Sequence, residues 1–289
     1  MSRRSEQGGT SIAAKTCLVT GANRGIGFEV AARLARLGGE VWIGARTAER
    51  GEAARRALRL RTGRDVHVVA MNLSSQASIR TAAQQWSLGA GRLDVLIHNA
   101  ATIPQQRLET VDGIEMQLAV NHLAGFLLTH LLMPQLVAAP SARVIVVSSN
   151  AHAKGRLDLD DLQATAHYDR RARYQATKLA NVLFVQALAR RLAGTRVSVN
   201  AVRPGTINTG LVRDFLWPFG FLRWLFVGST PARGAAPIVR AAIDPGLAGI
   251  TGGYFDRHRL RQAAPRALDP ALQEQLWQRS AKLVAVDTT

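Results

Sequence analysis

Tyr174 and Lys178 stand four positions apart, a spacing that places two side chains on one face of a helix. A phenol has a pKa of about 10, and a nearby ammonium group favours its ionised form and lowers that value. The pair is therefore a candidate for proton transfer by general acid–base catalysis. Because the pattern Tyr-x-x-x-Lys is also common by chance, its context must support this interpretation. Lysine occurs at only three other positions in this arginine-rich chain, and an amine can lose its proton where a guanidinium cannot.

Ser149 follows a short apolar run and is a second candidate for chemistry. A serine hydroxyl at the carboxyl end of a strand can point into the crevice and donate to a carbonyl oxygen, a use that needs no activated nucleophile. No Gly-x-Ser-x-Gly turn surrounds it, which disfavours hydrolase chemistry. We therefore expect a serine that binds an oxygen atom of the substrate.

A glycine-rich turn at residues 20–27 lies between an apolar run and a helical stretch that extends to Leu37. Glycines let the backbone approach a pyrophosphate, and the first amides of the helix then meet its charge. The alternative is an ordinary loop that happens to contain three glycines. The strand before the turn and the helix after it favour a dinucleotide site.

The elements that must position these residues alternate regularly. Six short apolar runs each precede a segment long enough for a helix. They cover residues 17–20, 41–44, 66–70, 95–99, 144–148 and 197–202. Residues 253–255 can add a seventh strand, and Thr230-Pro231 and Asp269-Pro270 mark the starts of two later helices. The pattern predicts an α/β fold, a parallel sheet of about seven strands with helices on both faces.

The composition fits one domain. With 289 residues and 47% hydrophobic content, the chain can form a single large core, which we place at residues 16–289 after a disordered polar tail at 1–15. The net charge of +17 would permit binding to nucleic acid or an anionic membrane surface, but the arginines are scattered along helical stretches. We expect no nucleic acid partner, no metal and no membrane span. A single cysteine, Cys17, fits a reducing cytoplasm.

Taken together, the motifs resemble those of the short-chain dehydrogenase/reductase family, and they occur in the family's order over nearly all of residues 16–283. They are the glycine turn, Asn99-Ala100, Asn121-His122-Leu123, Ser148-Ser149, the segment Tyr174 to Asn181, and Pro204-Gly205. The long insert at 153–173 is similar to the retinol dehydrogenase-like branch. The resemblance implies a Rossmann-like, doubly wound fold and an oxidoreductase that transfers hydride between a nicotinamide cofactor and an alcohol or carbonyl group. A cofactor-sensing protein without turnover is the alternative.

The resemblance also assigns roles to residues. Ser149, rather than Ser148, would hold the reacting carbonyl, Tyr174 would donate the proton, and Lys178 would lower the pKa of the tyrosine and bind the nicotinamide ribose. Asn121 would hold a water for proton relay. The cofactor-binding residues implied in this way are Gly21, Asn23, Arg24, Gly25, Ile26, Gly27, Arg46, Asn72, Leu73, Asn99, Ala100, Tyr174, Lys178, Pro204, Gly205, Ile207 and Thr209.

Arg46 occupies the position that selects the cofactor in this family. A carboxylate there would bind the ribose hydroxyl of NAD, whereas an arginine suits the 2′-phosphate of NADP, and Arg24 can approach the same phosphate. The two cations favour NADP(H), although solvated arginines are the alternative. Asn72 replaces the usual aspartate near the adenine amine, and its amide oxygen can accept the same bond. His98 and Ala101 also depart from the family's pattern.

Aromatic residues concentrate at 215–227, after the sixth strand. This position predicts a substrate lid at 211–228 with an apolar wall, and hence a lipophilic alcohol or carbonyl substrate. The alternative is that the aromatic side chains pack against a partner subunit. Helices at 115–138 and 174–193 form paired contacts in dimers of the family, so we also expect a homo-oligomer.

Overall fold

The structure is a computed structural model that describes residues 12–89, 91–207 and 229–287. Most of the predicted tail, the whole predicted lid at 211–228 and Thr209 lie outside these residues. The predicted start of the packed domain at residue 16 is too late, because Ile12 is fully buried and its amide donates to the carbonyl of Leu37 at 3.3 Å. One isoleucine in an otherwise polar or small-residue stretch was too weak a sequence signal to predict packing before residue 16.

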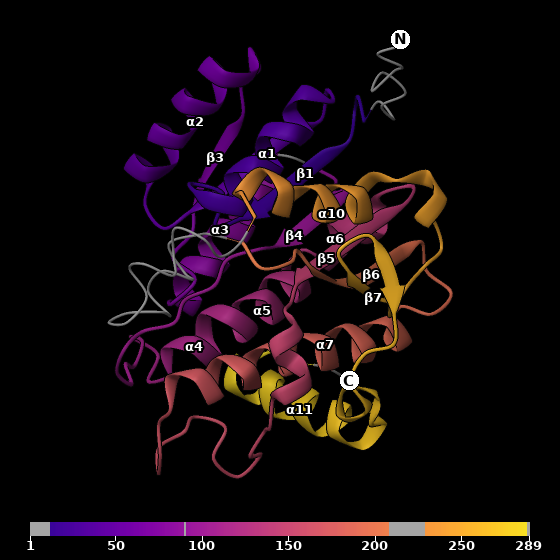
Figure 1. Ribbon diagram of the computed structural model, residues 1–289. Coiled ribbons are helices and arrows are strands. Elements are labelled where there is room, and N and C mark those ends of the chain that lie inside the picture. The colour runs from indigo at the N-terminus through magenta and orange to yellow at the C-terminus, as the bar shows by residue number, and fades with distance from the viewer. Residues whose placement is uncertain (1–11, 90, 208–228, 288–289) are drawn as a thin grey trace.

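One eight-stranded sheet forms the centre of the molecule (Figure 1). Its strand order is β3-β2-β1-β4-β5-β6-β7-β8, and all neighbours are parallel except β7 and β8. The strands are β1 (Thr16–Thr20), β2 (Glu40–Ala45), β3 (His67–Ala70), β4 (Val95–His98), β5 (Ala142–Val147), β6 (Val197–Arg203), β7 (Tyr254–Asp256) and β8 (Arg259–Arg261). The predicted doubly wound parallel sheet is therefore confirmed.

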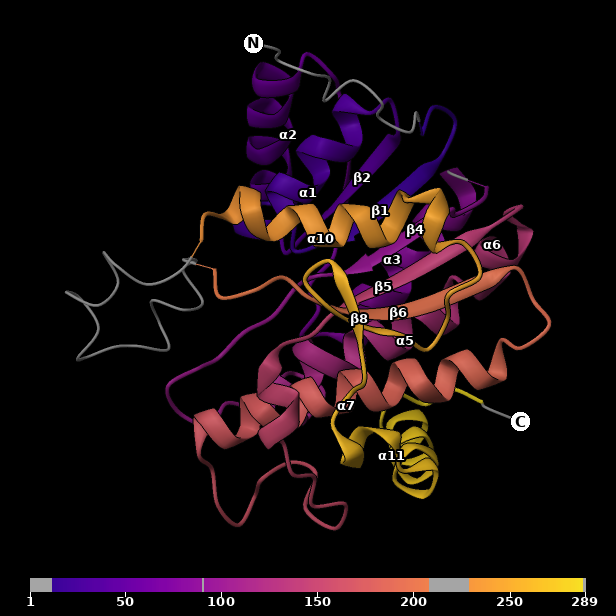
Figure 2. The same ribbon diagram turned by 45° about the vertical axis from the view of Figure 1, so that its right-hand side comes forward.

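Helices cover both faces of this sheet (Figure 2). The α-helices are α1 (Gly25–Arg36), α2 (Ala48–Thr62), α3 (Gln76–Gly89), α4 (Met116–Leu118), α5 (Ala124–Leu131), α6 (Met133–Ala138), α7 (Arg170–Arg191), α10 (Pro231–Ile243) and α11 (Pro270–Leu283). The described residues also form the π-helix η1 (Ala119–Leu123) and the 3-10 helices η2 (Asn150–Lys154), η3 (Pro245–Leu247) and η4 (Pro265–Leu268). No helix in the described ranges is long and apolar enough to cross a membrane.

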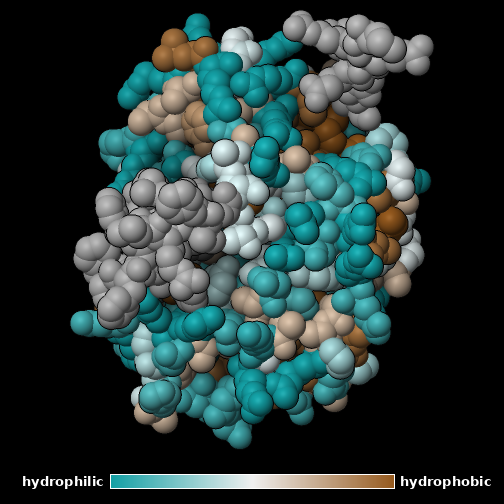
Figure 3. Space-filling view, in the orientation of Figure 1, coloured by the Kyte–Doolittle hydropathy of each residue, from teal (hydrophilic) through white to brown (hydrophobic). Residues whose placement is uncertain are grey.

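Two buried clusters explain the layered arrangement. Side chains of α1, α2 and α10 pack on one face of the sheet, and those of α3, α5, α7 and α11 pack on the other. All residues of β1, β4 and β5 are buried, as expected for parallel strands covered on both faces. On the face shown in Figure 3, hydrophilic side chains dominate and hydrophobic ones form small separate areas.

The strand order reverses between β1 and β4, which creates a crevice at the carboxyl ends of these strands. The glycine turn follows β1 at this edge and contacts Asn99 and Ala100 after β4, and the parallel strand β5 ends at the same edge. Elements far apart in the sequence thus bring the predicted site residues to one edge of the sheet.

Two features differ from the expected elements. The helix expected at 115–138 is interrupted by the π-helix η1 and breaks at Leu132. Pro134, the second residue of α6, has no amide hydrogen to donate to the preceding turn. The antiparallel strand β8 was not predicted, because its three residues are all exposed and show no apolar alternation. Charged side chains on such an edge strand oppose edge-to-edge association.

Helix α11 covers α5 and α7 within the same chain. The ring centroids of Trp277 on α11 and Phe126 on α5 are 4.8 Å apart. The guanidinium carbon of Arg191 on α7 lies 4.0 Å from the centroid of the Trp277 ring. The faces of α5 and α7 that face α11 are therefore not available for the predicted pairing between copies. A homo-oligomer would use another surface of the described chain or require α11 to move.

Candidate active site

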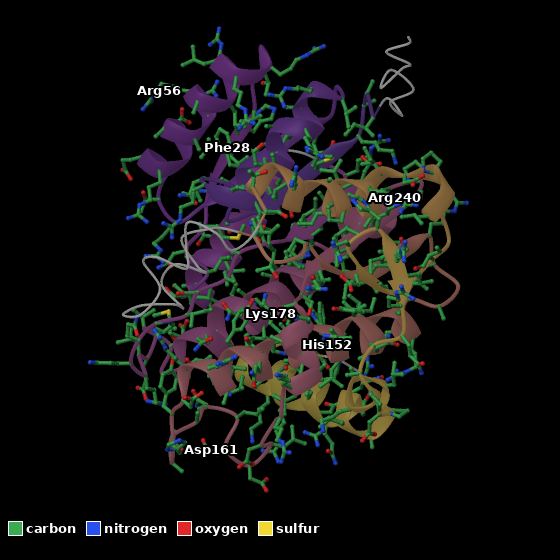
Figure 4. The ribbon with its side chains drawn as sticks, in the orientation of Figure 1. Phe28, Arg56, His152, Asp161, Lys178 and Arg240 are labelled. Carbon is green, nitrogen blue, oxygen red and sulfur yellow. The ribbon has the colours of Figure 1, made fainter. Side chains whose placement is uncertain are left out.

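Tyr174 and Lys178 share one face of α7, as their spacing predicts. The Lys178 ammonium nitrogen lies 5.5 Å from the centroid of the Tyr174 ring and donates to the carbonyl of Val147 at 2.9 Å. Only 3% of Lys178 is exposed, and this burial lowers its pKa to about 8. The amine is thus a titratable group inside the protein (Figure 4).

The Tyr174 hydroxyl keeps its proton near neutral pH. Burial raises its pKa to about 12, and a hydrogen bond with the Ser149 side chain opposes this rise. The hydrogen bond places the Ser149 hydroxyl beside the phenol. A protonated phenol suits a proton donor, and ionising it would require additional stabilisation of the phenolate.

The two neighbouring serines have different surroundings. Ser149 is the N-cap residue of η2, and its hydroxyl accepts from the amide of Ala151 at 3.2 Å. Ser148 is buried, and its hydroxyl donates to the carbonyl of Lys178 at 3.1 Å. Ser148 therefore fastens α7 to the end of β5, while Ser149 faces Tyr174. This arrangement agrees with the choice of Ser149 as the residue that binds the substrate oxygen.

Asn121 lies in the π-helix η1, and its amide is engaged within the protein. Its Oδ1 accepts from the amide of Thr102 at 2.7 Å, and its Nδ2 donates to the carbonyl of Thr102 and to the hydroxyl of Thr177. Both hydrogens of Nδ2 are used, so a relay water would need the second lone pair of Oδ1 or a main-chain carbonyl of this turn. Functional sites often contain such π-turns. The relay role of Asn121 stays a prediction.

A buried ion pair that was not predicted from the sequence connects the start of α4, which leads to Asn121, with α7, which carries Tyr174. Glu115 accepts from the amides of Gln117 and Leu118 at 2.7 and 2.8 Å and from the guanidinium of Arg173 at 2.7 Å. The two charged side chains are 0% and 6% exposed. Glu115 caps the helix that leads to Asn121, and Arg173 directly precedes Tyr174. A carboxylate just before a helical stretch was the only sequence signal for this contact.

The glycine turn has the geometry that the sequence predicts. Gly21 and Gly25 have φ angles of +63° and +61°, and a Cβ atom on Gly21 would lie 2.9 Å from the Cα of Ala100. A Cβ atom on Gly27 would lie 2.5 Å from the Nδ2 of Asn99 and from the carbonyl of Gly21. Asn99 in turn donates to the carbonyl of Gly21 at 3.3 Å. The glycines therefore allow the turn to pack closely against the end of β4.

Helix α1 begins at this turn without a side chain to cap its first amides. Free amides at the start of a helix are suited to an anion such as a pyrophosphate. Arg24 and Arg46 are exposed, and neither guanidinium group forms a hydrogen bond or ion pair within the described residues. The residues around the turn therefore fit a phosphorylated dinucleotide, although they do not by themselves select NADP or NAD.

Asn72 follows β3 and uses its amide oxygen locally. Its Oδ1 accepts from both the amide and the hydroxyl of Ser74, at 3.2 and 2.8 Å. Both lone pairs are thus engaged, and the Nδ2 donor is the group left for a ligand. This differs from the predicted acceptance of a bond from the adenine amine. Leu73 beside it is half-buried.

Pro204, Gly205 and Ile207 follow β6 at the same edge of the sheet. Gly205 has a φ of +100°, a value that glycine adopts readily. Ile207 is buried, pairs with Ser229 in a β-bridge and packs against Gly234 of α10. A contact between this segment and the nicotinamide stays a prediction.

The fold and this constellation define a class of proteins, the nicotinamide-dependent oxidoreductases with a Rossmann-like domain. The family model described as "short chain dehydrogenase" matches residues 15–216. The chain belongs to the short-chain dehydrogenase family and is an oxidoreductase similar to retinol dehydrogenases, as the sequence motifs predict.

Three relatives illustrate this membership. Human retinol dehydrogenase 13 is 40% identical over 287 residues, a match that covers 96% of this chain and 86% of the relative. A crystal structure of a protein from Mycobacterium paratuberculosis has a TM-score of 0.79 at 33% identity and covers 96% of both chains. The Pseudomonas aeruginosa RhlG/NADP active-site complex has a TM-score of 0.70 at 29% identity and covers 85% of this chain and 95% of that one.

Proposed function

We propose that this protein is an NADP(H)-dependent oxidoreductase that transfers hydride between the cofactor and an alcohol or carbonyl group of a lipophilic substrate. The observation that carries this proposal is the contact of Ser149 with Tyr174 and of Tyr174 with Lys178 at the carboxyl end of β5. It combines an oxygen-binding hydroxyl, a proton donor and a cation in one small volume.

The residues of this chain supply the steps other than hydride transfer. When bound, the reduced nicotinamide supplies the hydride that reaches the carbonyl carbon. Ser149 holds the carbonyl oxygen, and Tyr174 donates its proton to that oxygen as negative charge develops on it. The ammonium of Lys178 stabilises the phenolate that remains, until a proton from solvent restores the phenol. In the opposite direction the same groups remove the proton of an alcohol.

Arg24 and Arg46 support the preference for NADP(H). Both guanidinium groups are exposed at the edge of the sheet where the ribose of a dinucleotide lies in this fold, and no carboxylate follows β2 directly. Guanidinium groups bind phosphate through paired hydrogen bonds. The similarity to a structure that contains NADP supports the same choice.

The lipophilic substrate is proposed from the aromatic segment at 215–227, whose sequence carries six large aromatic side chains. Each buried methylene group of a substrate contributes about 0.8 kcal/mol, so such a wall favours long apolar chains over small polar carbonyl compounds. Relatives named retinol dehydrogenases support a substrate of this kind.

A screen of carbonyl compounds and alcohols with both cofactors, followed by nicotinamide absorbance, tests the proposal. We expect turnover with NADPH and a higher kcat/KM for apolar aldehydes or ketones with long chains than for short ones. Binding of NADPH without turnover across the panel would instead favour a cofactor-sensing protein. Turnover restricted to sugars or small acids would remove the argument for a lipophilic substrate.

A further inference from the structure

His152 lies three residues after Ser149 and has no part in the mechanism described above. Its ring is 4% exposed, and it belongs to η2, which packs against α7 (Figure 4). Its Nδ1 lies 2.7 Å from the carbonyl of Ser149, and its Nε2 lies 3.2 Å from the amide of Ala264. Because a carbonyl only accepts and an amide only donates, Nδ1 carries the hydrogen and Nε2 is unprotonated. The ring is therefore neutral and both of its nitrogens are engaged.

The far side of the ring is fixed by the C-terminal part of the chain. Ala264 directly precedes η4, and the ring of Tyr254 on β7 packs against His152 with 4.5 Å between centroids. Ala264 is 112 residues away from His152 in the sequence. The imidazole thus joins the loop after β5 to a segment that follows β8 and leads into η4, which packs against α7 and α11.

Ser149 receives its main-chain geometry from this contact. Its carbonyl accepts from the ring of His152 at 2.7 Å and from the amide of His152 at 3.2 Å. The peptide plane after Ser149 is therefore fixed, and with it the direction in which the serine side chain leaves the backbone. The hydroxyl of Ser149 then meets Tyr174.

We propose that His152 is a positioning residue that holds Ser149 in the orientation needed to bind the substrate oxygen, with Ala264 as its fixed support. The inference rests on the proposed function, in which Ser149 binds the carbonyl oxygen of the substrate. A displacement of about 1 Å at a group that contacts the reacting atoms can reduce a rate about 100-fold. A small shift of the Ser149 loop is thus enough for a large effect on kcat.

The contact with Ala264 also gives the site a dependence on pH. Burial lowers the pKa of His152, while its bond to Ser149 opposes this shift. At pH values below its pKa, a second ring proton would face the Ala264 amide hydrogen and break that contact. The phenol ring of Tyr254 on β7 contacts the His152 ring. Of the other elements packed against η2, η4 carries Arg266, which donates to the carbonyl of Gly155, and α7 carries Tyr174 and Lys178. Burial raises the pKa of both phenols to about 12 and lowers that of Lys178 only to about 8, so none of these three groups changes its charge in the acid range.

Three variants test the proposal. His152→Phe keeps a ring but loses both bonds, His152→Asn keeps a donor near the position of Nδ1, and His152→Gln keeps an acceptor near the position of Nε2. We expect His152→Phe to lower kcat roughly 10- to 100-fold while the dissociation constant of NADPH changes by about twofold or less. His152→Asn should recover most of kcat, and His152→Gln should recover less.

The pH profile separates positioning from a purely structural role. In the wild type, kcat should fall as His152 takes up a proton below pH 6.5, and this component should be absent from His152→Asn, which cannot titrate. A kcat of His152→Phe equal to that of the wild type would overturn the inference. So would equal losses of kcat and NADPH affinity in all three variants together with a lower melting temperature. A wild-type protein without any turnover would instead refute the proposed function.

Discussion

The buried ion pair between Glu115 and Arg173 predicts a large loss of stability on a small chemical change. Glu115→Gln keeps the size of the side chain but removes its charge. Arg173 cannot lose its proton, so its guanidinium, which is 6% exposed, would stay charged without a counter-ion. The remaining amide can also serve only one of the two main-chain amides that the carboxylate accepts from, those of Gln117 and Leu118.

Breaking a buried pair on one side costs about 3–5 kcal/mol. With a urea m value of about 3 kcal/mol/M, the midpoint of unfolding should fall by roughly 1 M or more. Asp65→Asn is the matched control, because Asp65 and Arg55 form a similar pair whose side chains are 46% and 40% exposed. Such exposed pairs contribute only about 0–1 kcal/mol.

Urea unfolding followed by circular dichroism measures both variants. The account predicts a clearly larger loss for Glu115→Gln than for Asp65→Asn. Adding Arg173→Met to Glu115→Gln should recover part of that loss, because the uncompensated charge is then removed. Equal and small losses for the two single variants would refute the reasoning.

Two further predictions concern the cofactor and acid stability. Arg46→Asp should weaken NADPH binding roughly 10- to 100-fold, the equivalent of one charged hydrogen bond, and shift the preference toward NADH in titrations with both cofactors. An unchanged ratio of the two affinities would leave Arg24 as the main phosphate ligand. Burial lowers the pKa of both His98 and His122 to about 4, so the unfolded chain binds more protons between that value and pH 6.5. The free energy of unfolding should therefore fall as the pH decreases through this range, by on the order of 3 kcal/mol per histidine, and a flat profile in urea titrations would contradict this.

The sequence was sufficient for the seven parallel strands because most of them are apolar and largely buried. Residues 144–147, for example, form a continuous run of β-branched apolar residues, which is typical of an interior parallel strand. The glycine turn was equally clear, since only glycine combines a positive φ with close packing against Ala100. Helix starts at Pro231 and Pro270 follow capping residues at 230 and 269, as expected.

Contacts between distant elements could not be read in the same way. His122, for example, is buried beneath α11, and its Nε2 lies 2.9 Å from the hydroxyl of Ser280. Helical periodicity gives the apolar face of a helix but not the distant segment that packs on it. The ion pair between Glu115 and Arg173 could not be predicted either, because the two residues are 58 positions apart in the sequence.

The break at Leu132 and the π-turn at Asn121 also could not be predicted from the periodicity of apolar residues. Both keep the apolar pattern of a continuous helix while they change its hydrogen bonds. The resemblance to the family located Asn121 as a candidate, and the structure shows what its amide contacts.

The direct test of the central claim is NADPH oxidation by the wild type and by Tyr174→Phe, measured with the best carbonyl substrate from the screen. The variant keeps the aromatic ring and loses only the hydroxyl that meets Ser149. The account predicts that kcat falls by about 10²–10⁴-fold while NADPH still binds, because the proton donor is removed and the phosphate-binding turn is untouched. A kcat within a few-fold of the wild type would contradict the assignment of Tyr174 as the proton donor.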